Sequence, residues 1–313
     1  MKKKTGHKMN TLKYLQSLSA DPEQQAASAV ELIQPGERHD VLLAAMIVLA
    51  ENPSEEAHDP LIRIYDYLAA NGVRRDAGAH VRSAVLNALR PVARLEDLPL
   101  LLRAVETYEY LPPGFKEEAG ALRAAALLAL NELEDETTDF HAVRLLVDQH
   151  TAQMSGEPAV TAVRVLSSRG ELAALFEYVM QPDESISAEV SSECLRNLTS
   201  LPTSLLPGLV TYLNRRANEV EQLGLFEMLI NHESGPQQLH YIESYLSDPD
   251  DLDVYRFVVI TALSSHQPEL LQLVCDVAEA EGDERRQRAL KEAMQPFTHH
   301  DRIAEIVQNL SLS

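Results

Sequence analysis

The chain has 313 residues, of which 48 are Asp or Glu and 27 are Lys or Arg, so its net charge is −21. Such an acidic surface repels nucleic-acid phosphates and anionic lipid, which argues against both as partners and favours a basic protein partner. Hydrophobic residues make up 45% of the chain, but aromatic residues only 5%, and Trp is absent. The sequence has no run of 18 apolar residues, so we expect no segment that spans a membrane.

The first thirteen residues differ from the rest of the chain because they hold five of its seven lysines. No apolar stretch follows them, so they do not form a secretory signal. We expect residues 1–13 to be a basic, disordered tail and residues 14–313 to be a single repeat domain. Asp21-Pro22 and Asp59-Pro60 then predict helix starts, because Asp caps a helix and Pro suits its first position.

Ala- and Leu-rich helical segments, here called A helices, recur along the chain from residue 38 to residue 310. Their repeat interval varies between 31 and 41 residues, which is typical of stacked helical repeats. Each segment ends on a large apolar residue. These residues are Leu49, Leu89, Leu130, Leu166, Leu198, Leu229, Leu263 and Met294.

A five-residue block containing a tyrosine follows several A helices and predicts a second set, the B helices. The tyrosines are Tyr67, Tyr110, Tyr178, Tyr212 and Tyr245, at intervals of 43, 68, 34 and 33 residues. Each tyrosine lies three residues after the residue that opens its block, on the flank of the apolar stripe. Two interpretations remain open: the tyrosines pack between neighbouring pairs, or they form a ladder of contacts for a bound peptide.

Between 12 and 21 residues separate the end of an A helix from the tyrosine of the following B helix. That length holds one tight turn and most of a second helix, so each repeat is an antiparallel helix pair. We therefore predict an all-α fold, a right-handed α-solenoid of about eight such pairs, in which neighbours stabilise one another.

The segments 81–89 and 122–130 resemble the A helix of HEAT and HEAT-like (PBS-lyase-type) repeats. That family carries an Arg before an Ala-rich apolar run, and Arg82 and Arg123 match it, whereas Thr161, Ser191 and Gln222 depart from it. The resemblance implies A helices on the outside, B helices lining a concave face, and a protein as the usual ligand. Tetratricopeptide repeats share the period, but the variable intervals and the missing Trp favour HEAT-like repeats.

The sequence gives no pattern of a catalytic or metal site. His299-His300-Asp301 is the densest ligand-type cluster, but we interpret it as a polar turn. The acids of 248–253 do not match a calcium loop. Cys194 and Cys275 are expected to be reduced and buried, which is typical of a cytoplasmic protein. We therefore expect no metal and no cofactor, and the sequence leans against an enzyme.

The hypothesis is a non-enzymatic scaffold that binds a partner protein segment along its concave B-helix face. The alternative is a HEAT-like enzyme or lyase subunit, similar to DNA glycosylases or chromophore lyases, with a pocket on that face. The acidity of the chain opposes the DNA-binding alternative, although Arg215-Arg216 and 285–288 are dense basic clusters beyond the tail. The candidate contact residues are Tyr67, Tyr110, Tyr178, Tyr212, Tyr245, Arg63, Arg103 and Arg144.

Overall fold

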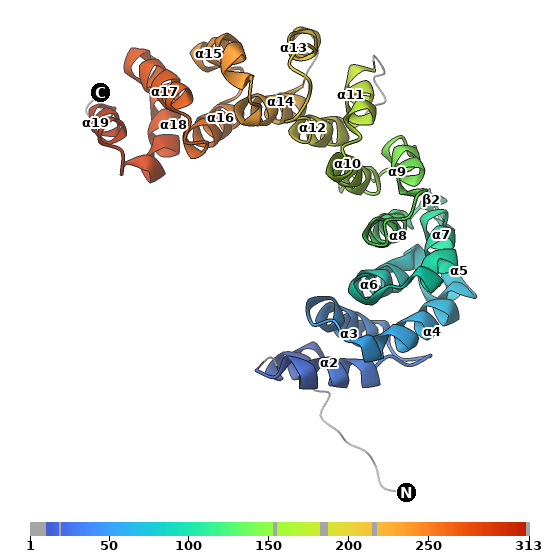
Figure 1. Cartoon of the computed structure of the whole chain (residues 1–313). Coiled ribbons are helices and arrows are strands. Elements are labelled where there is room, and N and C mark those ends of the chain that lie inside the picture. The colour runs from blue at the N-terminus through green and yellow to red at the C-terminus, as the bar shows by residue number, and fades with distance from the viewer. Residues whose placement is uncertain (1–10, 19, 153–154, 182–186, 215–217, 311–313) are drawn as a thin grey trace, which may run out of the picture. The chain divides into compact units, whose positions relative to one another are not determined.

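The computed structural model describes residues 11–18, 20–152, 155–181, 187–214 and 218–310 (Figure 1). Helices dominate these residues, so the predicted all-α fold class is confirmed. Most of the predicted basic tail, residues 1–10, lies outside the described residues, and so does Arg215-Arg216. Residues 11–13 do not belong to a tail, because they begin the first helix. Within the described ranges, no helix has both the length and the apolar character needed to cross a bilayer.

The contacts within the chain define two compact units, unit 1 (Met1–Val165) and unit 2 (Leu166–Ser313). We predicted a single domain over residues 14–313. Whether the two units combine into one domain is not decided by their internal contacts, so this stays a prediction. In unit 1 the α-helices are α1 (Thr11–Ser17), α2 (Pro22–Glu31), α3 (His39–Glu51), α4 (His58–Ala69), α5 (Gly72–Arg75), α6 (His80–Leu89), α7 (Leu98–Val105), α8 (Gly120–Glu132) and α9 (Thr138–Leu146). Helix α10 (Ala159–Ser168) runs across the boundary.

Unit 2 continues with helices of similar length, and polar side chains cap several of them. Asn218 and Glu221 form a reciprocal capping box at the start of one helix, and Asp251 and Asp283 cap two others. The helices are α11 (Leu172–Met180), α12 (Ala188–Arg196), α13 (Leu206–Leu213), α14 (Glu219–Asn231), α15 (Leu239–Ser247), α16 (Leu252–Ser264), α17 (Pro268–Ala280), α18 (Glu284–Met294) and α19 (Asp301–Asn309).

Short 3₁₀ helices and one hairpin complete the described structure. The 3₁₀ helices are η1 (Glu55–Ala57), η2 (Ala77–Ala79), η3 (Arg90–Val92), η4 (Leu95–Asp97), η5 (Gly235–Gln238) and η6 (Gln295–Phe297). Strands β1 (Tyr110–Leu111) and β2 (Lys116–Glu117) pair antiparallel between α7 and α8. Tyr110, which the sequence placed on a B helix, therefore lies on a strand. Pro112-Pro113-Gly114 explains the difference, because this tripeptide cannot continue a helix and forms a turn instead.

The predicted A helices are α3, α6, α8, α10, α12, α14, α16 and α18, and all but one contain their predicted terminal residue. The exception is Leu198, two residues beyond the end of α12, which is nevertheless fully buried. Successive A helices pack directly on each other, α3 on α6 and α6 on α8 in unit 1, and α12, α14, α16 and α18 in unit 2. Alanines allow this close approach, and Ala124, Ala125, Ala126 and Ala129 of α8 are all buried.

The position of the two helix sets differs from the expectation that B helices line a concave face. The second helices of the pairs, in the place of the predicted B helices, are α4, α7 and α9 in unit 1 and α11, α13, α15 and α17 in unit 2. Within each unit taken by itself, Figure 1 shows the A helices on the inner side of that unit's curve and these second helices on its outer side. Small side chains allow the A helices to approach closely: buried alanines do so on α8, and Gly224 and Ser192 do so between α14 and α12.

Gly224 marks the tightest approach between two A helices of unit 2. It lies in the middle of α14, where a Cβ atom would come within 2.5 Å of the Ser192 carbonyl oxygen of α12. A side chain there would have to push the helices apart, which makes glycine a packing requirement despite its low helix propensity.

Gly224→Ala is expected to lower the free energy of unfolding by about 1–3 kcal/mol, because the new methyl group overpacks the α12–α14 contact. Gly208→Ala in α13 is the matched control, since nothing lies within 4 Å of a Cβ atom there. That variant should gain about 0.5–1 kcal/mol from the better helix propensity of Ala. Urea unfolding of both variants measures the difference, and equal effects would contradict this account of α12–α14 packing.

Candidate functional site

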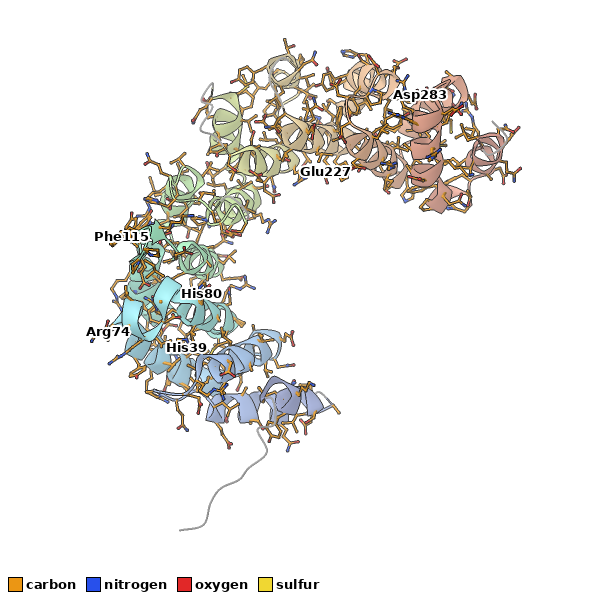
Figure 2. All side chains as sticks on the ribbon, turned by 180° about the vertical axis from the view of Figure 1, so that it is seen from behind. His39, Arg74, His80, Phe115, Glu227 and Asp283 are labelled. Carbon is orange, nitrogen blue, oxygen red and sulfur yellow. The ribbon has the colours of Figure 1, made fainter. Side chains whose placement is uncertain are left out.

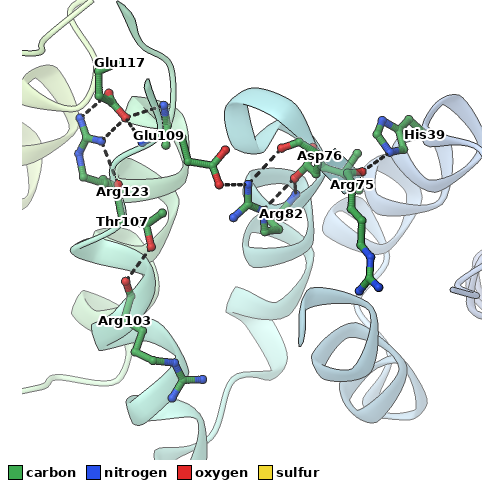
Figure 3. Close-up of polar contacts among 11 residues, drawn as sticks. His39, Arg75, Asp76, Arg82, Arg103, Thr107, Glu109, Glu117 and Arg123 are labelled. Carbon is green, nitrogen blue, oxygen red and sulfur yellow. Dashed lines mark hydrogen bonds and ion pairs between the residues drawn. The ribbon is translucent and has the colours of Figure 1, made fainter. Parts of the chain in front are cut away.

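Two arginines that the sequence singled out, Arg82 and Arg123, are buried in unit 1, and each is held by two carboxylates. Figure 3 shows Arg82 with Asp76 and Glu109, and Arg123 with Glu117. Arg82 begins the apolar run of α6. Its Nε lies 3.1 Å from Oδ2 of Asp76, and its Nη2 lies 2.6 Å from Oε1 of Glu109. Asp76 also accepts the backbone N–H groups of Val81 and Arg82, so it caps α6 as well as pairing with the guanidinium.

Gly72, the first residue of α5, leaves the space in which the Arg82–Glu109 pair lies. A Cβ atom on this residue would lie 2.2 Å from Glu109 Oε1 and 2.8 Å from Arg82 Nη1. The Arg82–Glu109 ion pair can therefore form only because α5 has no side chain at Gly72.

Arg123 on α8 is fully buried and its guanidinium is held on several sides. Both of its Nη atoms contact the carboxylate of Glu117, at 2.8 and 2.9 Å, in a bidentate pair. Its Nη2 also lies 3.1 Å from Oδ2 of Asp148. The ring of Tyr108 covers the face of the guanidinium at 3.9 Å, and the Tyr108 hydroxyl donates to Asp148 at 3.0 Å.

Glu117 also fixes the hairpin to the start of α8. Its Oε1 accepts the N–H of Glu109 at 3.1 Å and that of Ala119 at 2.8 Å. The segment between α7 and α8 thus contributes three members of the network, Tyr108, Glu109 and Glu117. Burial first, and then the carboxylate of Asp148, raise the pKa of the Tyr108 phenol, so Tyr108 remains protonated and donates its hydrogen bond at neutral pH.

Two cavities meet at Tyr108 on the surface of unit 1. The larger, about 630 Å³, is lined by Tyr65 and Asp66 of α4, by Arg82 and by Arg103, among others. The smaller, about 340 Å³, is lined by Tyr108, Tyr110, Arg144, Val147, Asp148, Gln149 and His150. The Tyr110 hydroxyl lies 3.0 Å from His150 Nε2, and the two rings meet edge to face at 5.4 Å.

The structure therefore brings together three of the eight predicted contact residues, Arg103, Tyr110 and Arg144, around Tyr108. Arg63 is exposed on α4 and lines neither cavity. Tyr67 is half-buried beneath the guanidinium of Arg75, which lies 4.1 Å from its ring.

The three remaining tyrosines lie in unit 2 and differ in burial. Tyr178 is only 8% exposed, and burial raises the pKa of its phenol to about 12. Tyr212 is half-buried on α13. Tyr245 packs its ring on Phe226 at 4.7 Å and donates its hydroxyl to the Asp251 carbonyl. For Tyr178 and Tyr245 the packing interpretation fits the contacts better than the ladder of exposed contacts.

An exposed apolar stripe on α9 lies beside the smaller cavity, and the sequence reasoning missed it. We define the α9 stripe as Phe140, Val143 and Val147, which are 77%, 43% and 54% exposed. Their spacing of three and four residues places them on one face of α9 and its C-terminal cap. The sequence of this segment could have revealed the stripe. Helix α9 also buries Ala142, Leu145 and Leu146, so it is apolar on two faces, although a single apolar face is enough to pack on the core.

The hairpin adds further exposed aromatic surface. Tyr110 is 47% exposed and Phe115 is 69% exposed. Figure 2 shows Phe115 at the outer edge of unit 1, away from the A helices. Exposed aromatic side chains stand out in a chain with so few aromatic residues.

Among the described residues, no group of three or more His, Cys, Asp or Glu side chains has an arrangement that could hold a metal ion. Cys194 and Cys275 are both buried and free, and burial raises the pKa of each thiol. Neither is a thiolate at neutral pH, so neither is an activated nucleophile.

Comparison with models of protein families, with curated proteins and with solved structures finds no match to this chain.

Arg123→Met is expected to lower the free energy of unfolding by about 3–5 kcal/mol, because it leaves the buried carboxylates of Glu117 and Asp148 without their cation. Arg90→Met is the matched control, since the side chains of Arg90 and Glu132 are 39% and 59% exposed and their charged atoms lie 4.0 Å apart. This control should cost less than about 1 kcal/mol. Chemical denaturation gives both values, and a small effect at Arg123 would show that the network does not stabilise unit 1.

Tyr178→Ala is expected to destabilise the chain by about 3 kcal/mol, because the phenol is buried in unit 2. Tyr110→Ala should change stability much less, since its ring is half exposed on the hairpin. Thermal unfolding followed by circular dichroism compares the two. If Tyr178→Ala leaves the melting temperature unchanged, Tyr178 is available as a contact residue and the ladder interpretation regains support.

Proposed function

We propose that this protein is a non-enzymatic scaffold of HEAT-like repeats that binds a partner protein. The proposed architecture is a right-handed α-solenoid of about eight antiparallel helix pairs, with a cytoplasmic location. The order of A and B helices, the direct packing of successive A helices and the buried arginines at the start of two A helices all support it.

The observation that carries the proposal is the α9 stripe together with Tyr110. Burying a Phe or Val side chain stabilises a protein by about 1.5–3 kcal/mol relative to leaving it in water. Unit 1 leaves Phe140 more than three-quarters exposed instead, on a helix that already has a complete buried face. An apolar surface of this kind on an otherwise acidic chain is typical of a protein-binding site.

The network around Arg123 gives this surface a fixed shape. Asp148, which pairs with Arg123, lies directly after α9, and its carboxylate also accepts the Tyr108 hydroxyl. Arg144 of α9 donates to the Val105 carbonyl at 2.9 Å. The hairpin, the end of α7 and the end of α9 are therefore tied together, so a partner meets a surface that is already organised.

The double change Phe140→Ser and Val147→Ser should abolish partner capture without unfolding the chain, since both side chains point into solvent. Serine keeps the net charge constant. Leu95→Ser is the control, because Leu95 is 69% exposed on η4 rather than on α9. Quantitative affinity purification from the native cell compares wild type, double variant and control. Proteins retained by wild type and control but lost from the double variant are the expected result.

Identical retention by all three forms, together with unchanged circular dichroism, would contradict a binding role for the α9 stripe. Loss of the same proteins from the Leu95→Ser control would contradict it as well, because the effect would then not be confined to α9.

A further inference from the structure

The α9 stripe has an acidic end. Four acids, Glu134, Asp135, Glu136 and Asp139, lie in the loop before α9 and in its first turn. Glu134 and Glu136 are exposed. Asp135 accepts the backbone N–H of Thr137 at 2.9 Å, which fixes the loop against the helix. Phe140 follows directly, so the most exposed apolar side chain lies next to a concentration of negative charge.

Among the described residues, neither the side of the α9 stripe nor its C-terminal end carries a free positive charge that would offset these four acids. Arg144 is the cation nearest to the stripe in sequence, and its guanidinium is engaged by Glu106 at 3.5 Å and by the Val105 carbonyl. At the far end, Val147 borders the smaller cavity with Tyr110 and His150. The surface is therefore apolar along its length, acidic at the end where α9 begins, and aromatic where it ends.

We propose that the α9 stripe docks an amphipathic helix of a partner protein, one with Lys or Arg beside its apolar face. This inference rests on the proposed scaffold function and names the chemistry of its partner. Phe140 and Val147 are seven residues apart, which corresponds to about 10 Å along the helix axis. Two turns of an incoming helix match this length, and ridge-into-groove packing against α9 buries its apolar side chains at the same spacing.

Charge selects this occupant over a second copy of the chain. Each copy carries a net charge of −21, and pairing of two α9 stripes would bring two acidic loops toward each other. Like charges placed together at an interface cost several kcal/mol, whereas a basic flank attracts the same loop and speeds encounter. Strand addition at the hairpin is a poorer alternative, because β1 and β2 have only two residues each.

The test uses two synthetic fluorescein-labelled peptides of 18 residues and the full chain. Both carry Leu at positions that form one helical face, and their flanking positions are Lys in one peptide and Glu in the other. Fluorescence anisotropy gives the dissociation constants. We expect the Lys peptide to bind at least about tenfold more tightly than the Glu peptide at low salt, and this ratio to shrink at about 1 M salt, where screening shortens electrostatic reach.

Three variants locate the site and the source of selectivity. Phe140→Ser combined with Val147→Ser should weaken binding of the Lys peptide at least about tenfold, since two buried apolar contacts are lost. Leu95→Ser should leave binding unchanged. Glu134→Lys combined with Glu136→Lys should lower the preference for the Lys peptide or invert it. Phe140, Val147, Glu134 and Glu136 are all exposed and belong to the proposed surface, whereas Leu95 is exposed outside it.

Each alternative result overturns a defined part of the proposal. Equal binding of both peptides, abolished by Phe140→Ser with Val147→Ser, would overturn the basic partner and leave the scaffold surface standing. Binding of the Lys peptide that this double variant does not weaken, or no binding of either peptide, would overturn docking of a helix on the α9 stripe. Analytical ultracentrifugation that finds a dimer lost in the double variant would assign the stripe to a second copy instead.

Discussion

Two buried guanidinium groups organise unit 1. Arg82 and Arg123 occupy equivalent places at the start of A helices, and each draws one carboxylate from the segment before its helix and another from a segment further along the chain. A buried charge is costly unless it is paired, so these contacts impose the positions of the loops that supply the acids. The hairpin, the end of α9 and the N-terminus of α8 are held by the second arginine. The pairing of Arg123 with Glu117 and Asp148 therefore fixes the geometry of the proposed binding surface at the end of α9.

The A helices pack closely on one another, and the α9 stripe lies on a helix outside that set. Small side chains allow the close packing, and Gly224 against Ser192 shows how little space is left between α12 and α14. On α9, Ala142, Leu145 and Leu146 are buried, while Phe140 and Val147 remain in solvent. The A helices α3, α14 and α16 expose one large apolar side chain each among the described residues, Ile47, Val220 and Ile260, whereas the α9 stripe groups three.

Acidity and exposed apolar surface act together in the proposed function. In this proposal, the negative charge would oppose pairing of two chains through the α9 stripe and would favour encounter with a basic partner. The apolar contacts would then supply most of the affinity, because paired surface charges contribute little in water. This division between affinity from packing and selectivity from charge requires no reactive group, in keeping with the buried, protonated cysteines.

Sequence periodicity by itself determined the helical class and the places of the A helices, because core-facing Ala and Leu must recur with the helical repeat to be buried. The resemblance to HEAT-like A helices also marked Arg82 and Arg123. Only the tertiary structure supplied their partners, because Glu109 and Asp148 lie 27 and 25 residues further along the chain. It likewise decided that Tyr178 is core while Tyr110 and Phe140 are exposed. Local spacing fixes which side of its own helix a residue occupies, whereas exposure depends on whether another element covers that side.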